Sequence, residues 1–294
     1  MRHFLNISDF SKAEILDMID LANDLKRGDS EPLNGKAIGM IFEKPSNRTR
    51  LSFEVGIDRL GGKAVYIKGD EIQIGTREPV SHVSRVMTRY FDMIVYRTKD
   101  HNYLQTFANH STVPIINGLS DQSHPCQAVA DALTIKNHFG SFDDVFLTYI
   151  GDGNNVCQSL MEIAIKCGFK MAVVCPTKYA PINPPDGIIV TDSIDDVIGQ
   201  TNVIYTDVWV SMGDEAERLE RLNDFSNYQV NKGVIDKAHD NCIFLHCLPA
   251  NLGEEVTEEV FESEQSKVFD QAENRMHAQN GIMSWLMKGN KNEK

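Results

Sequence analysis

The sequence predicts an α/β protein with two open parallel-sheet domains, each carrying helices on both faces of its sheet. Short apolar runs alternate along the chain with longer amphipathic stretches, which is the pattern of parallel strands covered by helices. About four of these runs fall in the first half of the chain and about five in the second. A chain of 294 residues is also too long for one small hydrophobic core, so two domains are the natural expectation.

The first half begins with a helix that Ser8 and Asp9 can cap and that runs to about Lys26. Strands are expected at residues 37–42, 64–67, 93–96 and 113–117, and later helices at 101–109 and 126–139. Residues 68–79 are polar and show no periodicity, which indicates a loop. The helix after this loop is expected to group four apolar side chains on one side: Val83, Val86, Met87 and Tyr90.

The second half repeats the same alternation. Strands are expected at residues 145–150, 171–175, 188–190, 202–205 and 242–246, and helices at 154–167 and 273–286. The Pro-rich residues 180–185 predict a loop, and the chain from Lys288 onward reads as a polar tail. We expect the helix at 126–139 to join the two domains.

Composition excludes several classes of protein. The net charge of −13 argues against a nucleic-acid-binding surface, which needs a basic face. The six cysteines form no C-x-x-C pair, which argues against a zinc ribbon or a thioredoxin-type site. The N-terminus lacks the apolar core of a secretory leader, and no run of about 18 apolar residues predicts a membrane span. We therefore expect a cytoplasmic protein with reduced thiols.

The segment Ser46-Asn47-Arg48-Thr49-Arg50 stands where the first strand turns into a helix. The first turn of a helix has unpaired N–H groups and the positive end of the helix dipole, which together favour an anion. Arginine adds a planar fork that matches phosphate oxygens. This segment therefore predicts a phosphate site, although a serine cap followed by solvated arginines is the alternative.

Other polar residues follow the predicted strands one after another. In open α/β sheets, ligands bind outside the carboxyl ends of the strands. The residues at these positions are Ser46, Arg48, Thr49, Arg97, His124 and Gln127 in the first half, and Asn154, Asn155, Asp207, Ser211, His246 and Cys247 in the second. Two sheets facing each other would bring these groups into one interdomain cleft. We expect an enzyme in which a phosphorylated small molecule meets an amino compound.

Several motifs resemble those of the aspartate/ornithine carbamoyltransferase family, and especially its ornithine branch. They are Ser46-Asn47-Arg48-Thr49-Arg50, His124-Pro125-Cys126-Gln127, Gly151-Asp152-Gly153-Asn154-Asn155, Asp207-Val208-Trp209-Val210-Ser211-Met212-Gly213, His246-Cys247-Leu248-Pro249 and Ala272-Glu273-Asn274-Arg275. The resemblance covers essentially the whole chain. It implies transfer of the carbamoyl group of carbamoyl phosphate to the δ-amine of L-ornithine, giving L-citrulline and phosphate, without a cofactor or a metal.

The resemblance also implies a domain organisation and an assembly. The carbamoyl-phosphate-binding domain would span 1–131, the ornithine-binding domain 132–272, and a C-terminal helix at 273–294 would return to the first domain. The family commonly forms a homotrimer, in which Gln73 would reach the site of a neighbouring subunit; a loop residue without a role is the alternative. Arginine biosynthesis and the reverse direction, citrulline phosphorolysis, both remain open.

Roles in the first domain follow from the same resemblance. Ser46, Arg48 and Thr49, with the backbone N–H of Asn47, would bind the phosphate of carbamoyl phosphate. Arg97 would bridge the phosphate and the carbonyl oxygen, and His124 would donate to that oxygen. Gln127 would accept from the carbamoyl NH2 group, and Arg275 would return to contact carbamoyl phosphate. The alternatives are a surface cation for Arg97, a purely structural role for His124, and a position on the helix surface for Gln127.

Roles in the second domain concern the amino acid. Asn155, Asp207, Ser211 and Met212 would hold the α-amino and α-carboxylate groups of ornithine, with helix capping as the alternative for Asp207. Cys247, with the carbonyl of Leu248, would orient the δ-amine and the carbamoyl group. Neighbouring residues of a strand point to opposite faces, so we expect His246 and Cys247 not to form a nucleophilic dyad. Arg48, Arg97, His124 and Cys247 are thus the expected catalytic residues.

Two positions depart from the family pattern. Asn47 stands where threonine is frequent, but its backbone N–H can still serve the phosphate. Asn251-Leu252-Gly253 stands where a His-Arg pair is frequent, which puts a contact from that loop in doubt.

Other functions remain as alternatives. Gly151-Asp152-Gly153 follows a strand as in a dinucleotide-binding oxidoreductase, but Val156 occupies the position of the third glycine. A carbamoyltransferase for aspartate, putrescine or N-acylornithine is possible, and so is a non-catalytic binding relative.

Overall fold

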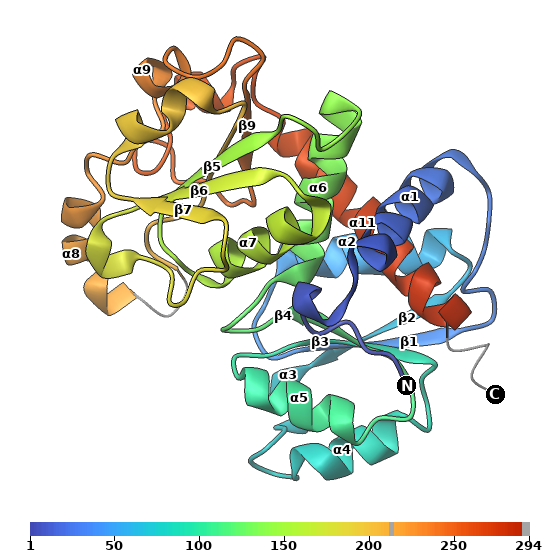
Figure 1. Cartoon of the computed structure of the whole chain (residues 1–294). Coiled ribbons are helices and arrows are strands. Elements are labelled where there is room, and N and C mark those ends of the chain that lie inside the picture. Colours follow the sequence, from blue (N-terminus) through green and yellow to red (C-terminus); the bar gives the residue numbers. More distant parts are fainter. Residues whose placement is uncertain (212–214, 290–294) are drawn as a thin grey trace. The chain divides into compact units, whose positions relative to one another are not determined.

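The computed structural model describes residues 1–211 and 215–289 (Figure 1). The chain divides into two units, one formed by Met1–Ala130 with Glu273–Lys294 and the other by Asp131–Ala272. We call them unit 1 and unit 2. The chain passes from one unit to the other twice, after Ala130 and after Ala272.

Unit 1 contains a four-stranded parallel sheet in the order β2-β1-β3-β4. Its strands are β1 Ala37–Phe42, β2 Lys63–Lys68, β3 Met93–Arg97 and β4 Ile115–Leu119. The central strands β1 and β3 are almost wholly buried, as continuous apolar runs predict for a sheet covered on both faces. Figure 1 shows α4 and α5 on one side of this sheet and α2 and α11 on the other.

The helices of unit 1 fill both sides of the sheet. They are α1 Lys12–Arg27, α2 Asn47–Arg59, α3 Gly69–Ile72, α4 Val80–Met87 and α5 His101–Asn109, together with most of α11 Val268–Gly289 and the start of α6 Pro125–Phe139. Helix α11 approaches α1 closely at Gly281, where a Cβ atom would lie 2.4 Å from the carbonyl oxygen of Met18. A side chain at this position would push α11 away from α1.

Unit 2 contains a five-stranded parallel sheet in the order β7-β6-β5-β8-β9. Its strands are β5 Phe146–Ile150, β6 Lys170–Val174, β7 Ile188–Thr191, β8 Val203–Thr206 and β9 Ile243–His246. Its helices include α7 Asn155–Cys167, α8 Arg218–Asp224, α9 Lys232–Ile235 and α10 Glu258–Phe261. Figure 1 shows α7 on one side of the sheet and α9 on the other.

The two parallel sheets, with four and five strands, confirm the predicted fold class. The β1, β2, β3 and α5 segments agree with the prediction to within a residue at each end. No helix in the described part of the chain is both long and apolar enough to cross a membrane.

Several local predictions were wrong. Ser11 caps α1, because Glu14 completes a capping box with it, whereas Ser8 and Asp9 lie in a preceding turn of 3-10 helix. The predicted loop 68–79 contains the short helix α3. The fourth strand begins later, at Ile115.

The buried side of α4 also differs from the prediction. It consists of Val80, Val83 and Ser84, whereas Val86 is 47% exposed. The helix ends at Met87, so Tyr90 lies beyond it and is 71% exposed. The C-terminal helix is also longer than predicted, since α11 begins at Val268 rather than at residue 273.

Candidate active site

Each sheet has a point at which the strand order reverses, and polar side chains gather at both points. In unit 1 the reversal lies between β1 and β3, and in unit 2 it lies between β5 and β8. Ligands of open α/β sheets bind outside the carboxyl ends of the strands at such a point.

Helix α2 begins directly after β1, and Ser46 is its N-cap. The Ser46 hydroxyl accepts the backbone N–H of Thr49 at 3.3 Å, which holds the first turn of the helix. Asn47 and Arg48 are exposed in this turn, whereas Thr49 is buried. The segment therefore has the predicted geometry, a helix N-terminus with an arginine in its first turn.

Thr49 lies between two buried arginines from distant parts of the chain. Its hydroxyl oxygen accepts from Arg275 Nη2 at 2.8 Å and lies 3.4 Å from Arg97 Nη1. Arg275 comes from α11, and its Nη1 donates to Gln127 Oε1 at 2.7 Å. Unit 1 thus brings the predicted Thr49, Arg97, Gln127 and Arg275 together. We call these four residues, with Arg48 and His124, the arginine cluster.

Arg97 is the last residue of β3 and only 4% exposed. Burial lowers its pKa to about 10, and the positive charges of Arg275 and Arg48 add to this effect. Its Nε has no hydrogen-bond partner within the described part of the chain. A buried guanidinium beside other guanidiniums is costly, so this cluster favours an anion.

His124 is buried at the start of α6. Burial lowers its pKa well below the usual value, and the charges of Arg275 and Arg97 lower it further. The imidazole is therefore neutral at physiological pH and carries one N–H donor.

Glu43 is a residue of unit 1 that the sequence analysis missed. Its carboxylate accepts from the Thr98 hydroxyl at 2.7 Å and from the Tyr96 hydroxyl, and its N–H donates to the carbonyl of Arg97 at 3.0 Å. Glu43 therefore ties the end of β1 to the end of β3, through the residues directly before and after Arg97 and through the Arg97 carbonyl. Its only signal in the sequence was an acidic residue just after a strand.

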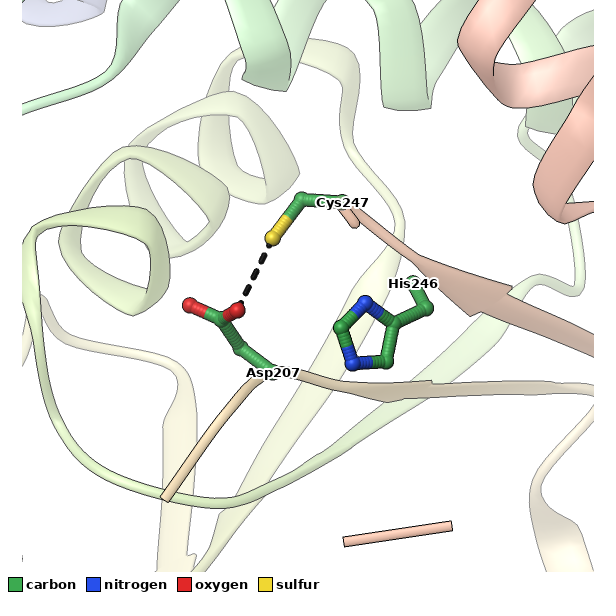
Figure 2. Close-up of side chains that lie close together, drawn as sticks. All are labelled: Asp207, His246 and Cys247. Atoms are coloured by element: carbon green, nitrogen blue, oxygen red, sulfur yellow. Dashed lines mark hydrogen bonds between the residues drawn. The ribbon is translucent and has the colours of Figure 1, made fainter. Parts of the chain in front are cut away.

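In unit 2, Asp207 follows β8 and is buried. Its Oδ1 accepts the N–H of Val208 at 2.8 Å and the thiol of Cys247 at 3.0 Å, and its Oδ2 accepts Asn154 Nδ2 at 3.0 Å. Figure 2 shows the Cys247 sulfur pointing toward the Asp207 carboxylate. The structure thus joins two predicted residues, Asp207 and Cys247, that are 40 positions apart.

Asn154, which directly precedes the predicted Asn155, makes a contact with Asp207. Asn154 is the N-cap of α7, and its Oδ1 accepts the N–H groups of Val156 and Cys157. Asn155 is the first residue of α7 and is partly exposed. Capping one helix and orienting one carboxylate is a positioning function that the sequence alone did not assign to Asn154.

The remaining predicted residues lie in loops. Ser211 is partly exposed, and Met212 lies outside the described residues. Gln73 is exposed at the C-terminal end of α3, where it has a left-handed backbone with φ of 47°. Leu248 is also left-handed, with φ of 60°, and its N–H donates to His246 Nδ1 at 2.9 Å.

The argument that His246 and Cys247 point to opposite faces was wrong. Strand β9 ends at His246, so strand alternation does not extend to Cys247. One ligand atom from each of Asp207, His246 and Cys247 lies within 4.8 Å of the others, the spacing of a possible metal site (Figure 2).

Both nitrogens of His246 are nevertheless engaged. Nδ1 accepts from Leu248, so a neutral ring carries its proton on Nε2, which lies 3.2 Å from Glu255 Oε1. To bind a metal ion, or to accept the proton of the Cys247 thiol, His246 would have to lose one of these two hydrogen bonds. The geometry therefore favours neither a metal centre nor a Cys-His nucleophile.

Arg221 links the two loops of unit 2 that carry predicted residues. This side chain of α8 is buried, and its Nη1 donates to Asp152 Oδ2 at 2.8 Å and to the carbonyl of Trp209 at 3.3 Å. Asp152 follows β5, and Trp209 lies between Asp207 and Ser211. Arg221 has no local signal in the sequence, because its partners are far away along the chain.

Comparison with known families gives two matches that together span nearly the whole chain. Residues 2–137 match the carbamoyl-phosphate binding domain of aspartate/ornithine carbamoyltransferases, and residues 143–286 match their Asp/Orn binding domain.

Individual relatives extend over the same length. The ornithine carbamoyltransferase of Oceanobacillus iheyensis is 46% identical, over 97% of this chain and 94% of the relative. That of Methanosphaera stadtmanae is 43% identical, over 98% of this chain and 100% of the relative. Among solved structures, the ornithine carbamoyltransferase of Pyrococcus furiosus superposes with a TM-score of 0.93 at 41% identity, covering 98% of this chain and 97% of that one. The anabolic ornithine carbamoyltransferase of Campylobacter jejuni superposes with a TM-score of 0.92 at 33% identity, with full coverage of both chains.

Proposed function

Since the chain belongs to the aspartate/ornithine carbamoyltransferase family, we propose that it transfers the carbamoyl group of carbamoyl phosphate to the δ-amine of L-ornithine. The products are L-citrulline and phosphate. The observation that carries this proposal is the arginine cluster, in which the buried guanidiniums of Arg97 and Arg275 meet at the Thr49 hydroxyl and favour a bound dianion. The relatives' names supply the amino acid.

The phosphate group binds at the first turn of α2. Ser46, Arg48 and Thr49, with the Asn47 N–H, contact its oxygens, since a helix N-terminus with an arginine suits a dianion. Arg275 and Arg97 already meet at the Thr49 hydroxyl. These two guanidiniums supply charge on the side from which the carbamoyl group leaves.

His124 acts on the carbonyl oxygen. Its depressed pKa keeps it neutral, so one N–H can donate to the oxygen as negative charge develops there. Arg97 supports the same oxygen. Gln127 Oε1, which accepts from Arg275 in the structure, also accepts from the carbamoyl NH2, because a carbonyl oxygen has two lone pairs.

The amino acid is held by unit 2. Asp207 binds its α-ammonium, and Asn155, Ser211 and Met212 serve the α-amino and α-carboxylate groups. An ionised carboxylate has about four acceptor sites. Val208, Asn154 and Cys247 occupy three sites on Asp207, which leaves room for an ammonium donor. The Cys247 thiol and the Leu248 carbonyl orient the δ-amine.

The δ-amine must lose a proton before it attacks. Its reference pKa resembles that of lysine, about 10.4, so supplying the neutral form near pH 7.5 costs roughly 4 kcal/mol. Desolvation and nearby cations lower this pKa, so that the first proton passes to solvent before attack. The departing phosphate then takes the second proton from the attacking nitrogen as the bond between the carbamoyl carbon and the phosphate oxygen breaks. Both ring nitrogens of His246 are engaged, so this residue is not the base.

Assembly, location and pathway are part of the same proposal. We propose a homotrimer in which the exposed Gln73 reaches the site of a neighbouring subunit. We further propose a cytoplasmic enzyme of arginine biosynthesis, a direction supported by the anabolic description of the Campylobacter jejuni relative.

A panel of amines tests the function. Purified protein is incubated with carbamoyl phosphate and, in separate reactions, ornithine, putrescine, N-acetylornithine or aspartate, and the ureido product is measured with phosphate. We expect citrulline with ornithine, in equal amount to phosphate, and at least 100-fold slower reaction with the others. A faster reaction with another amine would reassign the substrate, and no product at all would identify a non-catalytic relative.

A further inference from the structure

Gln271 is a buried residue of unit 2 to which the proposed chemistry assigns no part. It lies in the first turn of α11 and is 1% exposed. Its side-chain amide is used at both ends: Nε2 donates to Asp131 Oδ1 at 2.6 Å, and Oε1 accepts the backbone N–H of His246 at 2.9 Å. Glutamine suits this place because a neutral amide both donates and accepts.

The two partners of Gln271 stand at distinctive positions in the fold. Asp131 is fully buried and is the first residue of unit 2, while Gln271 is the last but one. The bond between them therefore joins the two chain segments that pass from one unit to the other. They lie 140 positions apart in the sequence.

His246 connects these segments to the candidate site. Strand β9 is at the edge of its sheet, and residues 265–267 pair with its outer side through the N–H and carbonyl of Phe244. Two residues further along β9, the N–H of His246 also points to this outer side, and the side chain of Gln271 accepts it. His246 in turn accepts from the N–H of Leu248, next to the Cys247 thiol that donates to Asp207.

We infer that Gln271 is a positioning residue that fixes the Cys247–Leu248 turn relative to both passages between the units. The inference rests on the proposed function, in which this turn orients the δ-amine. Without the amide, the edge of β9 loses its last outer hydrogen bond, and the turn can shift away from Asp207. A displacement of about an ångström at a positioning group can cost about a hundredfold in rate.

The test is the substitution Gln271→Met, with Gln279→Met as its matched control. Methionine keeps the length and burial of glutamine but forms neither hydrogen bond. Gln279 lies on the same helix and is 0% exposed, but neither polar atom of its side chain has a hydrogen-bond partner in the described part of the chain. The same substitution there removes no bond.

For Gln271→Met we expect kcat/KM for ornithine to fall 10- to 100-fold, while the Kd of carbamoyl phosphate, measured by calorimetry, stays within twofold. Gln279→Met should leave both quantities within twofold of the wild type. Unchanged ornithine kinetics in Gln271→Met would overturn the inference, and so would an equal loss in both variants or an equal weakening of carbamoyl phosphate binding. A wild-type protein that forms no citrulline would instead overturn the proposed function.

A second variant keeps the inference testable if the methionine variant does not fold. Gln271→Glu retains an acceptor for the His246 N–H but sets a second carboxylate against Asp131, near Tyr205. Two adjacent carboxyl groups share one proton as the pH falls, which restores a donor toward Asp131. The rate of this variant relative to the wild type should rise at least threefold from pH 8.5 to pH 6. A constant ratio would contradict the positioning role.

Discussion

Arg97→Met should stabilise the ligand-free protein while abolishing carbamoyl phosphate binding. The structure places this guanidinium 4% exposed beside two others, and burial lowers its pKa to about 10. The charged form is thus disfavoured in the folded state. Methionine has a similar length and fills the same space without the charge.

The magnitude follows from the pKa. At about 1.36 kcal/mol per pKa unit, lowering the pKa of an arginine to about 10 corresponds to roughly 3 kcal/mol. Because the folded-state pKa lies below the unfolded value, this cost is fully present at neutral pH, begins to fall only as the pH rises above about 10, and is lost only above the unfolded pKa. The variant also loses the 3.4 Å contact with Thr49, worth about 1 kcal/mol. We expect a net gain of about 1–2 kcal/mol.

Thermal unfolding in phosphate-free buffer at pH 7 measures this gain. For a unit of this size the midpoint should rise by roughly 2–8 °C. With saturating carbamoyl phosphate, the wild type should have the higher unfolding midpoint, because the ligand raises the midpoint of the wild type but not that of the variant. Arg27→Met, at a site 75% exposed in α1, should change neither midpoint. A ligand-free variant less stable than the wild type by 1 kcal/mol, or one that carbamoyl phosphate still stabilises, would refute the reasoning.

Three further predictions follow from the site. His124→Asn should lower kcat by about 10²–10³ with little change in the KM of ornithine, and an unchanged kcat in the citrulline assay would exclude the donor role. The kcat/KM for ornithine should rise with pH toward a plateau as the δ-amine loses its proton, since His124 is already neutral; a flat profile from pH 6 to 9 would count against this scheme. Arg221→Met should raise the KM of ornithine about tenfold, because it removes the hydrogen bonds to Asp152 and to the Trp209 carbonyl. Arg218→Met, which removes an exposed ion pair of the same helix, should leave this KM unchanged. Equal effects of the two substitutions would point to general destabilisation of α8.

The elements that could be predicted from the sequence are those whose signals are local. The β1 and β3 segments were predictable because they are buried on both faces and hence apolar throughout. The N-cap Ser46 followed from a hydroxyl placed directly before a helical pattern. The strand ends then drew attention to Arg97 and Asp207, because parallel strands present their carboxyl ends on one side of a sheet.

The residues missed are those whose partners are distant in sequence. Arg221 meets Asp152 across 69 positions and Gln271 meets Asp131 across 140, and neither pair has a local signature. The contact of Asn154 with Asp207 spans 53 positions and likewise has no local signature. The strand-alternation argument for Cys247 failed because β9 ends one residue earlier than the argument required.

The central claim is that the carbamoyl group passes directly from phosphate to the amine, without a covalent intermediate on Cys247. Initial rates of citrulline formation, measured with both substrates varied, test it most directly. Direct transfer predicts double-reciprocal lines that intersect, since both substrates must be bound together. Parallel lines, with carbamoylated protein trapped in the absence of ornithine, would contradict it.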